Sequence, residues 1–127
     1  MIVLDASVLI AHLDERDELN ARAEEALERA AREPLGCSAI TLAEVLVAPA
    51  RHGQLSAAQA AMAELEVAEI AIGAHAAVRL ATMRAAVGLK LPDCCVLLAG
   101  EDAGAHAILT FDDALARAAE RSGFETV

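Results

Sequence analysis

Short apolar runs alternate with longer amphipathic stretches along this chain, and the alternation predicts an α/β fold. Met1–Leu4 is a β-branched apolar run typical of a buried parallel strand, and Ala107–Thr110 forms a second short strand. Asp17–Arg32 instead repeats apolar residues at helical spacing, with Glu and Arg between them. Strands that alternate with helices form a parallel sheet covered on both faces. We therefore expect a single domain spanning residues 1–127.

Glycine, proline and capping residues predict where the remaining elements begin and end. Pro92 suits a first helical turn, and Gly53 and Gly88 end two other helices. Ser56 is the expected N-cap of one helix. Val67–Ile72 alternates apolar and acidic residues, which predicts a half-buried strand at the edge of the sheet. The other expected strands are Leu35–Ser38 and Phe124–Val127, and the other expected helices are Ala6–Leu13, Thr41–His52, the segment from Ser56 to about Glu66, Ala74–Val87, Asp93–Ala103 and Asp113–Arg121.

Composition and charge narrow the kinds of partner that the chain can bind. Apolar residues make up 57% of the chain and aromatic residues only 2%, so the core must consist of Ala, Leu, Val and Ile. The formal net charge of −10 makes the protein a poor generic binder of nucleic acid, which needs Lys and Arg to displace counterions. A phosphate substrate would need a local source of positive charge, such as a bound divalent cation.

The cysteines and the first residues indicate a reduced, cytoplasmic environment. Cys37, Cys94 and Cys95 have neither metal-ligand nor disulfide-framework spacing, so we expect reduced core residues. The opening residues reach Asp5 too soon for a signal peptide, and no apolar run is long enough to cross a membrane.

Four carboxylates stand at positions where a parallel sheet would collect them. Asp5 directly follows the first strand, and Asp112 follows the Ala107–Thr110 strand within two residues. Asp93 lies in the first turn of its helix, and Glu44 lies one turn into the helix after the second strand. Ligands of such sheets bind at the carboxyl ends of the strands. We therefore expect the four side chains to meet at one edge.

A cluster of carboxylates has a definite chemistry. The four charges repel one another, so the cluster must bind protons or cations. Ligand sets made only of oxygen favour Mg²⁺ or Mn²⁺ over zinc. Such an ion can activate water, polarise a phosphoryl oxygen and stabilise a departing oxygen, which suits phosphodiester hydrolysis.

Each carboxylate also has a purely structural interpretation. Asp5 could cap the first helix, Asp93 could be a first-turn acid, and Asp112 with Asp113 could cap and open the last helix. Taken singly, these structural roles are favoured. Glu44 is harder to explain in this way, because its neighbours are apolar and an unpaired buried carboxylate is costly.

Four motifs together resemble the PIN-domain family. They are MIVLDAS at Met1–Ser7, SAITLAEV at Ser38–Val45, LPD at Leu91–Asp93 and LTFD at Leu109–Asp112, in the order and spacing of the family. Within the family, the chain is similar to VapC-type ribonuclease toxins of type II toxin–antitoxin systems. The resemblance covers nearly the whole chain. It implies a three-layer α/β/α sandwich with a central, mainly parallel sheet of about five strands.

The resemblance also implies an activity and a set of site residues. The activity is that of a Mg²⁺- or Mn²⁺-dependent endoribonuclease, a hydrolase, with Asp5, Glu44, Asp93 and Asp112 as catalytic acids. The three aspartates would be the nearest metal ligands, and Glu44 would act directly or through water. Ser7 would support the site by hydrogen bonding, although a core or capping role for it is nearly as well favoured. The implied partners are RNA, a VapB-type antitoxin that blocks the acidic groove, and a second copy of the chain in a homodimer or a toxin–antitoxin hetero-oligomer. Freed from its antitoxin, the toxin would inhibit translation or growth.

The remaining polar residues give weaker indications. The family's T-x-D pattern selects Asp112 over Asp113, which suits a first-turn position at a helix dipole. His12 could approach the Asp5 edge, but a surface or capping role is favoured. Substrate contacts are expected from the basic residues that precede the Asp93 motif, namely Arg79, Arg84 and Lys90. Most of the arginines Arg16, Arg22, Arg29 and Arg32 are expected on a solvated helix face paired with Glu24, Glu25 and Glu28, although some could instead guide RNA or contact an acidic partner.

Three other functions fit less well. A phosphatase of the haloacid dehalogenase type would have a second Asp two residues after Asp5, where Ser7 stands. A phosphoreceiver domain needs a Lys late in the sheet, and none follows Lys90. The third alternative is a catalytically silent, metal-binding PIN-like interaction domain, which the presence of all four acids disfavours.

Overall fold

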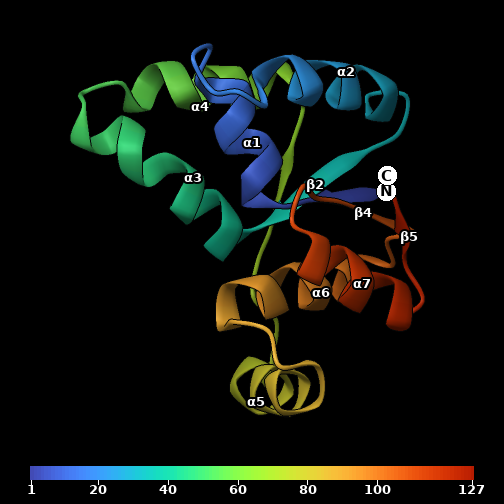
Figure 1. Cartoon of the computed structure of the whole chain (residues 1–127). Coiled ribbons are helices and arrows are strands. Elements are labelled where there is room, and N and C mark those ends of the chain that lie inside the picture. Colours follow the sequence, from blue (N-terminus) through green and yellow to red (C-terminus); the bar gives the residue numbers. More distant parts are fainter.

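The centre of the structure is a sheet of five short strands. The computed structural model describes residues 1–127 (Figure 1). Its strands are β1 (Ile2–Leu4), β2 (Leu35–Ser38), β3 (Ala68–Ile70), β4 (Ala107–Leu109) and β5 (Glu125–Thr126). Their order in the sheet is β3-β2-β1-β4-β5, and every neighbouring pair is parallel. The predicted α/β class with a parallel sheet of about five strands is confirmed.

Strand β1 holds the central place because all its side chains can be buried. Ile2 and Leu4 pack into one hydrophobic core and Val3 packs into another, on the opposite face of the sheet. This alternation is what the pleat of a strand dictates. Ile2 lies in register with Leu35 of β2 and Ala107 of β4. The strand predicted at Val67–Ile72 is β3, and its place at the edge of the sheet is confirmed. It is less buried than expected, because Ala68 and Glu69 are exposed and only Ile70 is partly buried.

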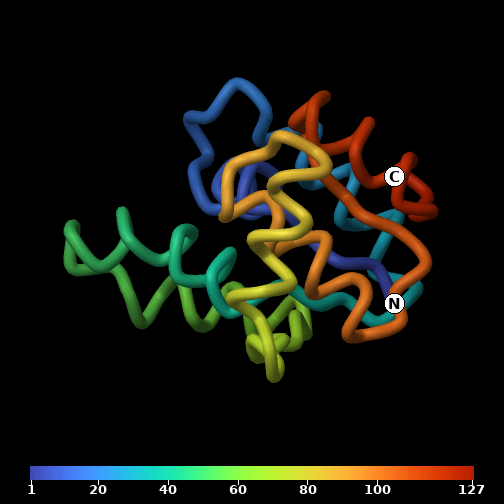
Figure 2. The backbone as a smooth tube through the Cα atoms, turned by 90° about the horizontal axis from the view of Figure 1, so that it is seen from below, coloured from blue at the N-terminus to red at the C-terminus, as the bar shows by residue number.

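Seven helices surround the sheet. They are α1 (Ala6–Leu13), α2 (Asn20–Ala30), α3 (Ala39–Arg51), α4 (Leu55–Glu64), α5 (Ala76–Val87), α6 (Leu91–Ala103) and α7 (Asp113–Arg121). Helices α1, α2 and α4 lie above the sheet in Figure 1, and α6 and α7 lie below it. Helix α5 packs against α6 outside this lower layer and buries no residue completely. The α3–α4 hairpin projects sideways, as Figure 2 also shows. This arrangement is the three-layer α/β/α sandwich that was expected.

Helix starts differ from the expected ones where local hydrogen bonds decide them. Helix α3 begins at Ala39, because the Ser38 hydroxyl caps it by accepting a bond from the backbone N–H of Ile40. The prediction that Ser56 caps α4 was wrong. That helix already begins at Leu55, and it has no side-chain cap.

Candidate active site

Asp5 lies at the carboxyl end of β1, where two hydroxyl groups hold its carboxylate. Its Oδ2 accepts hydrogen bonds from Ser7 Oγ at 2.6 Å and from Thr110 Oγ1 at 2.8 Å. Asp5 is only 6% exposed. Every side-chain oxygen or nitrogen that is fully buried in the structure has a hydrogen-bond partner. Because Oδ1 makes no hydrogen bond within the chain, it must reach the solvent-accessible surface. One oxygen of Asp5 is therefore fixed, and the other is free for a ligand.

The same two hydroxyls join β1 to the turn that follows β4. Thr110 Oγ1 accepts from the backbone N–H of Asp112, and Ser7 Oγ accepts from that of Phe111, both at 3.0 Å. Ser7 thus contacts Asp5 as expected. Thr110 was not among the predicted site residues. The T-x-D pattern Thr110-Phe111-Asp112 was the available signal for Thr110, but this pattern by itself only favours Asp112 over Asp113.

Asp112 occupies the N-cap of α7, so the capping role expected from the sequence is confirmed. Its Oδ1 accepts from the backbone N–H of Leu115 at 2.8 Å, which leaves Oδ2 without a partner in the chain. Asp113 lies in the first turn of the same helix, is exposed and makes no side-chain bond to the site. Capping and ligand binding are compatible in Asp112, because each uses a different oxygen.

Asp93 and Glu44 reach the same region from α6 and α3, two helices that contact each other. Asp93 follows Pro92 in the first turn of α6 and is partly buried. Glu44 lies in the second turn of α3, between the buried residues Thr41 and Val45. The expectation that Glu44 is buried was wrong. Its side chain is exposed on the same face of α3 as Ile40 and Val47, which are exposed too, whereas Thr41 and Val45 turn inward.

The four carboxylates affect one another electrostatically. The pKa of Glu44 is raised by desolvation, then by the negative charges of Asp5 and Asp93. The pKa of Asp93 is raised by desolvation, then by the charges of Asp5 and Asp112, and Lys90 partly offsets this. The fold thus brings all four predicted acids to one edge of the sheet.

No ion pair within the chain compensates the charge of this edge, and only Lys90 partly offsets it at Asp93. None of the four carboxylates belongs to any of the six ion pairs in the structure. At the same time, no three acidic, His or Cys side chains are gathered tightly enough to form a ready-made metal centre. The region is therefore an acidic edge without ion pairs and with free oxygens.

The structure separates the three predicted substrate-contact residues. Arg79 donates to Asp102 at 2.6 Å and to Glu101 at 3.1 Å, so its guanidinium is engaged away from the acidic edge. Arg84 donates to the backbone carbonyl of Leu89 at 3.0 Å. Lys90 makes neither an ion pair nor a side-chain hydrogen bond within the chain, and its charge acts on Asp93.

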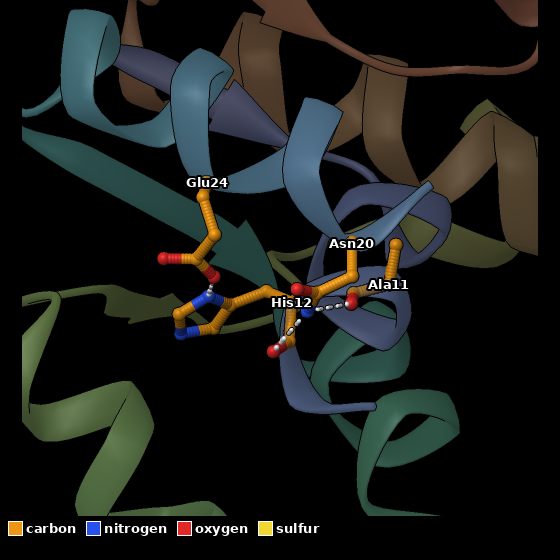
Figure 3. A network of polar contacts seen from close by, with 4 residues as sticks. All are labelled: Ala11, His12, Asn20 and Glu24. Carbon is orange, nitrogen blue, oxygen red and sulfur yellow. Dashed lines mark hydrogen bonds and ion pairs between the residues drawn. The ribbon is translucent and has the colours of Figure 1, made fainter. Parts of the chain in front are cut away.

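His12 connects two helices rather than entering the acidic edge. Its Nδ1 is paired with the Glu24 carboxylate of α2, as Figure 3 shows. In the same network, Asn20 Nδ2 donates to the carbonyls of Ala11 and His12 at 2.9 and 3.3 Å (Figure 3). These bonds satisfy carbonyls at the end of α1. His12 therefore has the surface role that its sequence context favoured.

The fold and the acidic edge agree with one family of proteins. The family model for the PIN domain matches residues 2–121 of the chain. The chain belongs to the PIN domain family. The resemblance inferred from four short motifs is thus confirmed over almost the whole length of this PIN domain. No curated protein matches it in sequence.

Solved structures similar to this PIN domain include toxins of toxin–antitoxin pairs. A toxin–antitoxin complex from Klebsiella pneumoniae is 26% identical, with a TM-score of 0.73 over 88% of this chain and 87% of that one. VapC20 from Mycobacterium tuberculosis, described as a sarcin–ricin loop cleaving toxin, is 17% identical, with a TM-score of 0.71 over 98% and 96%. FitAcB from Neisseria gonorrhoeae is 18% identical, with a TM-score of 0.71 over 99% and 96%. No helix of this PIN domain combines the length and apolar character needed to cross a bilayer.

Proposed function

We propose that this PIN domain is a metal-dependent endoribonuclease that acts as the toxin of a toxin–antitoxin pair. The observation that carries the proposal is the acidic edge, where Asp5, Glu44, Asp93 and Asp112 interact electrostatically and none of them forms an ion pair. PIN domains generally use a divalent metal ion. The RNA-cleaving description of VapC20 supports RNA as the substrate class.

The residues present suit a hard divalent cation, Mg²⁺ or Mn²⁺. All the donors are carboxylate oxygens, and Oδ1 of Asp5 and Oδ2 of Asp112 have no partner in the chain. Asp5, Asp93 and Asp112 would hold the ion, with Glu44 in contact directly or through water. When bound, the ion supplies the positive charge that activates water and stabilises the phosphoryl oxygens.

The chain itself contributes orientation and a proton acceptor. Ser7 and Thr110 fix the Asp5 carboxylate by holding Oδ2, so that Oδ1 keeps one direction. The Glu44 carboxylate is exposed and belongs to no ion pair, so it is available to accept a proton. We assign Glu44 the removal of a proton from the attacking water.

Substitution of single acids tests the enzyme assignment. Asp5→Asn and Asp93→Asn should each abolish cleavage of RNA in Mg²⁺, with circular dichroism and melting temperature showing an intact fold. Glu64 is an exposed carboxylate on α4, away from the four acids, and serves as the control. Glu64→Gln removes the same charge and should cleave RNA like the wild type. Undiminished cleavage by either Asn variant, or cleavage that persists in chelator, contradicts the proposal. Metal binding without any cleavage by the wild type would favour the catalytically silent alternative.

Growth experiments test the toxin assignment separately. Two of the similar structures are described as a toxin–antitoxin complex and as FitAcB, which supports an antitoxin partner and a hetero-oligomer. Induction of the wild-type chain should arrest growth, and induction of Asp5→Asn should not. Co-expression of a short reading frame adjacent to this gene should relieve the arrest. Normal growth on induction of active protein would contradict a toxin role without contradicting nuclease activity.

A further inference from the structure

The side chain of Arg22 lies over the ring of Phe111. The guanidinium carbon is 4.5 Å from the ring centroid, and this is the only cation–π contact of the protein. Arg22 belongs to the first turn of α2, in the layer above the sheet, whereas Phe111 lies in the turn after β4. A guanidinium stacked on an aromatic face keeps the N–H donors around its rim available to acceptors in its own plane.

The backbone of Phe111 is bonded to the acidic edge, and its ring contacts Arg22. The backbone N–H of Phe111 donates to Ser7 Oγ at 3.0 Å, and Ser7 in turn donates to Asp5. Asp112 is the next residue in the chain. A continuous line of contacts therefore runs from the Arg22 guanidinium through the Phe111 ring and backbone to the fixed carboxylate.

Arg22 makes no ion pair, although the chain has 20 acidic and 10 basic residues. Most arginines of this segment were expected to pair with a glutamate, and Arg22 is an exception. Arg29, two turns further along α2, does pair and donates to Glu25 at 2.6 Å. Stacking on Phe111 instead leaves the Arg22 guanidinium without an ion pair, against the ring of the residue between Thr110 and Asp112.

We propose that Arg22, held on Phe111, contacts a phosphate of the RNA next to the bond that is cleaved. This inference rests on the proposed ribonuclease function and names one substrate contact of that site. The planar fork of a guanidinium fits two phosphate oxygens, and a chain of net charge −10 needs local cations where the RNA strand approaches. Because the stack already orders the side chain, less conformational entropy is lost on binding.

The test compares Arg22→Met with Arg29→Met on a fluorescent single-stranded RNA oligonucleotide. Met keeps apolar packing on Phe111 and removes the charge. Arg29→Met removes the same charge from the same face of α2, about 10 Å further along the helix. With Mg²⁺ and about 0.1 M salt, Arg22→Met should raise KM about tenfold and change kcat less than about twofold. The slope of log affinity against log salt, measured by anisotropy, should become shallower by about 0.7. Arg22→Lys should fall between Arg22→Met and the wild type, and Arg29→Met should match the wild type.

Three results would overturn this contact. The first is an unchanged KM and salt slope in Arg22→Met, and the second is an equal change in Arg29→Met, which would reflect net charge alone. The third is a loss of melting temperature and kcat with KM unchanged, which would mean that Arg22 only packs. If the wild type binds the oligonucleotide without cleaving it, the proposed enzyme activity fails, and the salt slope still decides the role of Arg22. If the wild type does not bind it at all, both proposals fail.

Discussion

Thr110 connects two of the proposed metal ligands through one hydroxyl group. It donates to Asp5 Oδ2 at 2.8 Å and accepts from the Asp112 N–H at 3.0 Å, and it is only 8% exposed. Thr110→Val keeps the shape and removes both bonds. We expect it to weaken Mg²⁺ affinity and RNA cleavage by about 10–100-fold, the usual effect of losing a group that orients a ligand.

The conservative variant separates positioning from general packing. Thr110→Ser keeps the hydroxyl and loses a methyl group, so it should retain most of the activity even if it lowers stability. Mg²⁺ titrations of cleavage, together with melting temperatures, distinguish the two effects. If Thr110→Val kept wild-type Mg²⁺ dependence, or if Thr110→Ser were equally inactive, Thr110 would not position Asp5 in the proposed way.

Asp93 should destabilise the metal-free protein at neutral pH. Its pKa is raised by desolvation and by the charges of Asp5 and Asp112, so its ionised form is disfavoured in the folded state. Folding is then favoured by protonation. The penalty is absent well below the ordinary pKa of 3.8, grows as pH rises toward the raised folded pKa, and is complete above it.

The neutral variant Asp93→Asn measures this penalty. In EDTA at pH 7 it should unfold at a higher temperature than the wild type, and its advantage should shrink as pH falls through the raised pKa. The comparison uses thermal unfolding of both proteins over a series of pH values. An advantage that stays constant with pH, or a less stable variant, would argue against charge repulsion at this edge.

The sequence predicted which acids meet, but not how they are held. Asp5 and Asp112 could be placed because each follows a strand closely, and the carboxyl ends of parallel strands share an edge. The bond from Thr110 to Asp5 spans 105 positions and depends on a single side-chain rotamer, which no local pattern encodes. Arg79 was predicted to contact substrate, but it is paired with Asp102 and Glu101. These partners lie more than 20 positions away in the sequence, so no local pattern indicated them.

Among the elements, boundaries were predicted well where capping and apolar spacing agree. Helix α7 begins where expected, because Asp112 is its N-cap. Helix α5 begins at Ala76 rather than Ala74, because His75 before it adopts a left-handed backbone conformation with φ of 59°. Helix α2 begins at Asn20 rather than Asp17, since the Asp17 side chain accepts from the N–H of Leu19 and forms a turn.

Helix α3 contains a proline, Pro49, that should weaken the helix. Pro49 lies inside the helix, where it cannot donate a bond to the carbonyl of Val45. Pro49→Ala restores that donor, so it should raise the free energy of unfolding by about 1–3 kcal/mol. Urea unfolding measures the change. Ala50→Gly, on the exposed side of the same turn, should lower stability by about 0.5–1 kcal/mol and shows whether α3 contributes to global stability. An unchanged Pro49→Ala would mean that the helix frays before the rest unfolds.

For the whole molecule, the pattern of burial could be predicted and the outlying helix α5 could not. The α/β sandwich follows from strands that are buried on both faces, such as β1. The position of α5 does not follow, because α5 buries no residue completely. Core formation therefore constrains α5 least, whereas the α3–α4 hairpin, although it projects sideways, is held by Val45 and Met62 in the core.

The net charge of −10 and the acidic edge without ion pairs together predict a specific response to divalent ions. Salt should stabilise the protein weakly by screening general repulsion. Mg²⁺ should stabilise it more than NaCl of equal ionic strength, because an ion held by Asp5, Asp93 and Asp112 binds only the folded state. At about 100 times its Kd, the ion should add about 2.7 kcal/mol to the free energy of unfolding.

The variants decide whether this stabilisation comes from the acidic edge. Asp5→Asn should lose most of the Mg²⁺-specific rise in melting temperature while keeping the response to NaCl. Glu64→Gln, with the same net charge, should keep both responses. If all three proteins gained equally from Mg²⁺, the ion would be acting on the general negative charge of the surface. Stabilisation specific to the wild type and Glu64→Gln would place the ion at the edge where β1 and β4 end, independently of any measurement of RNA cleavage.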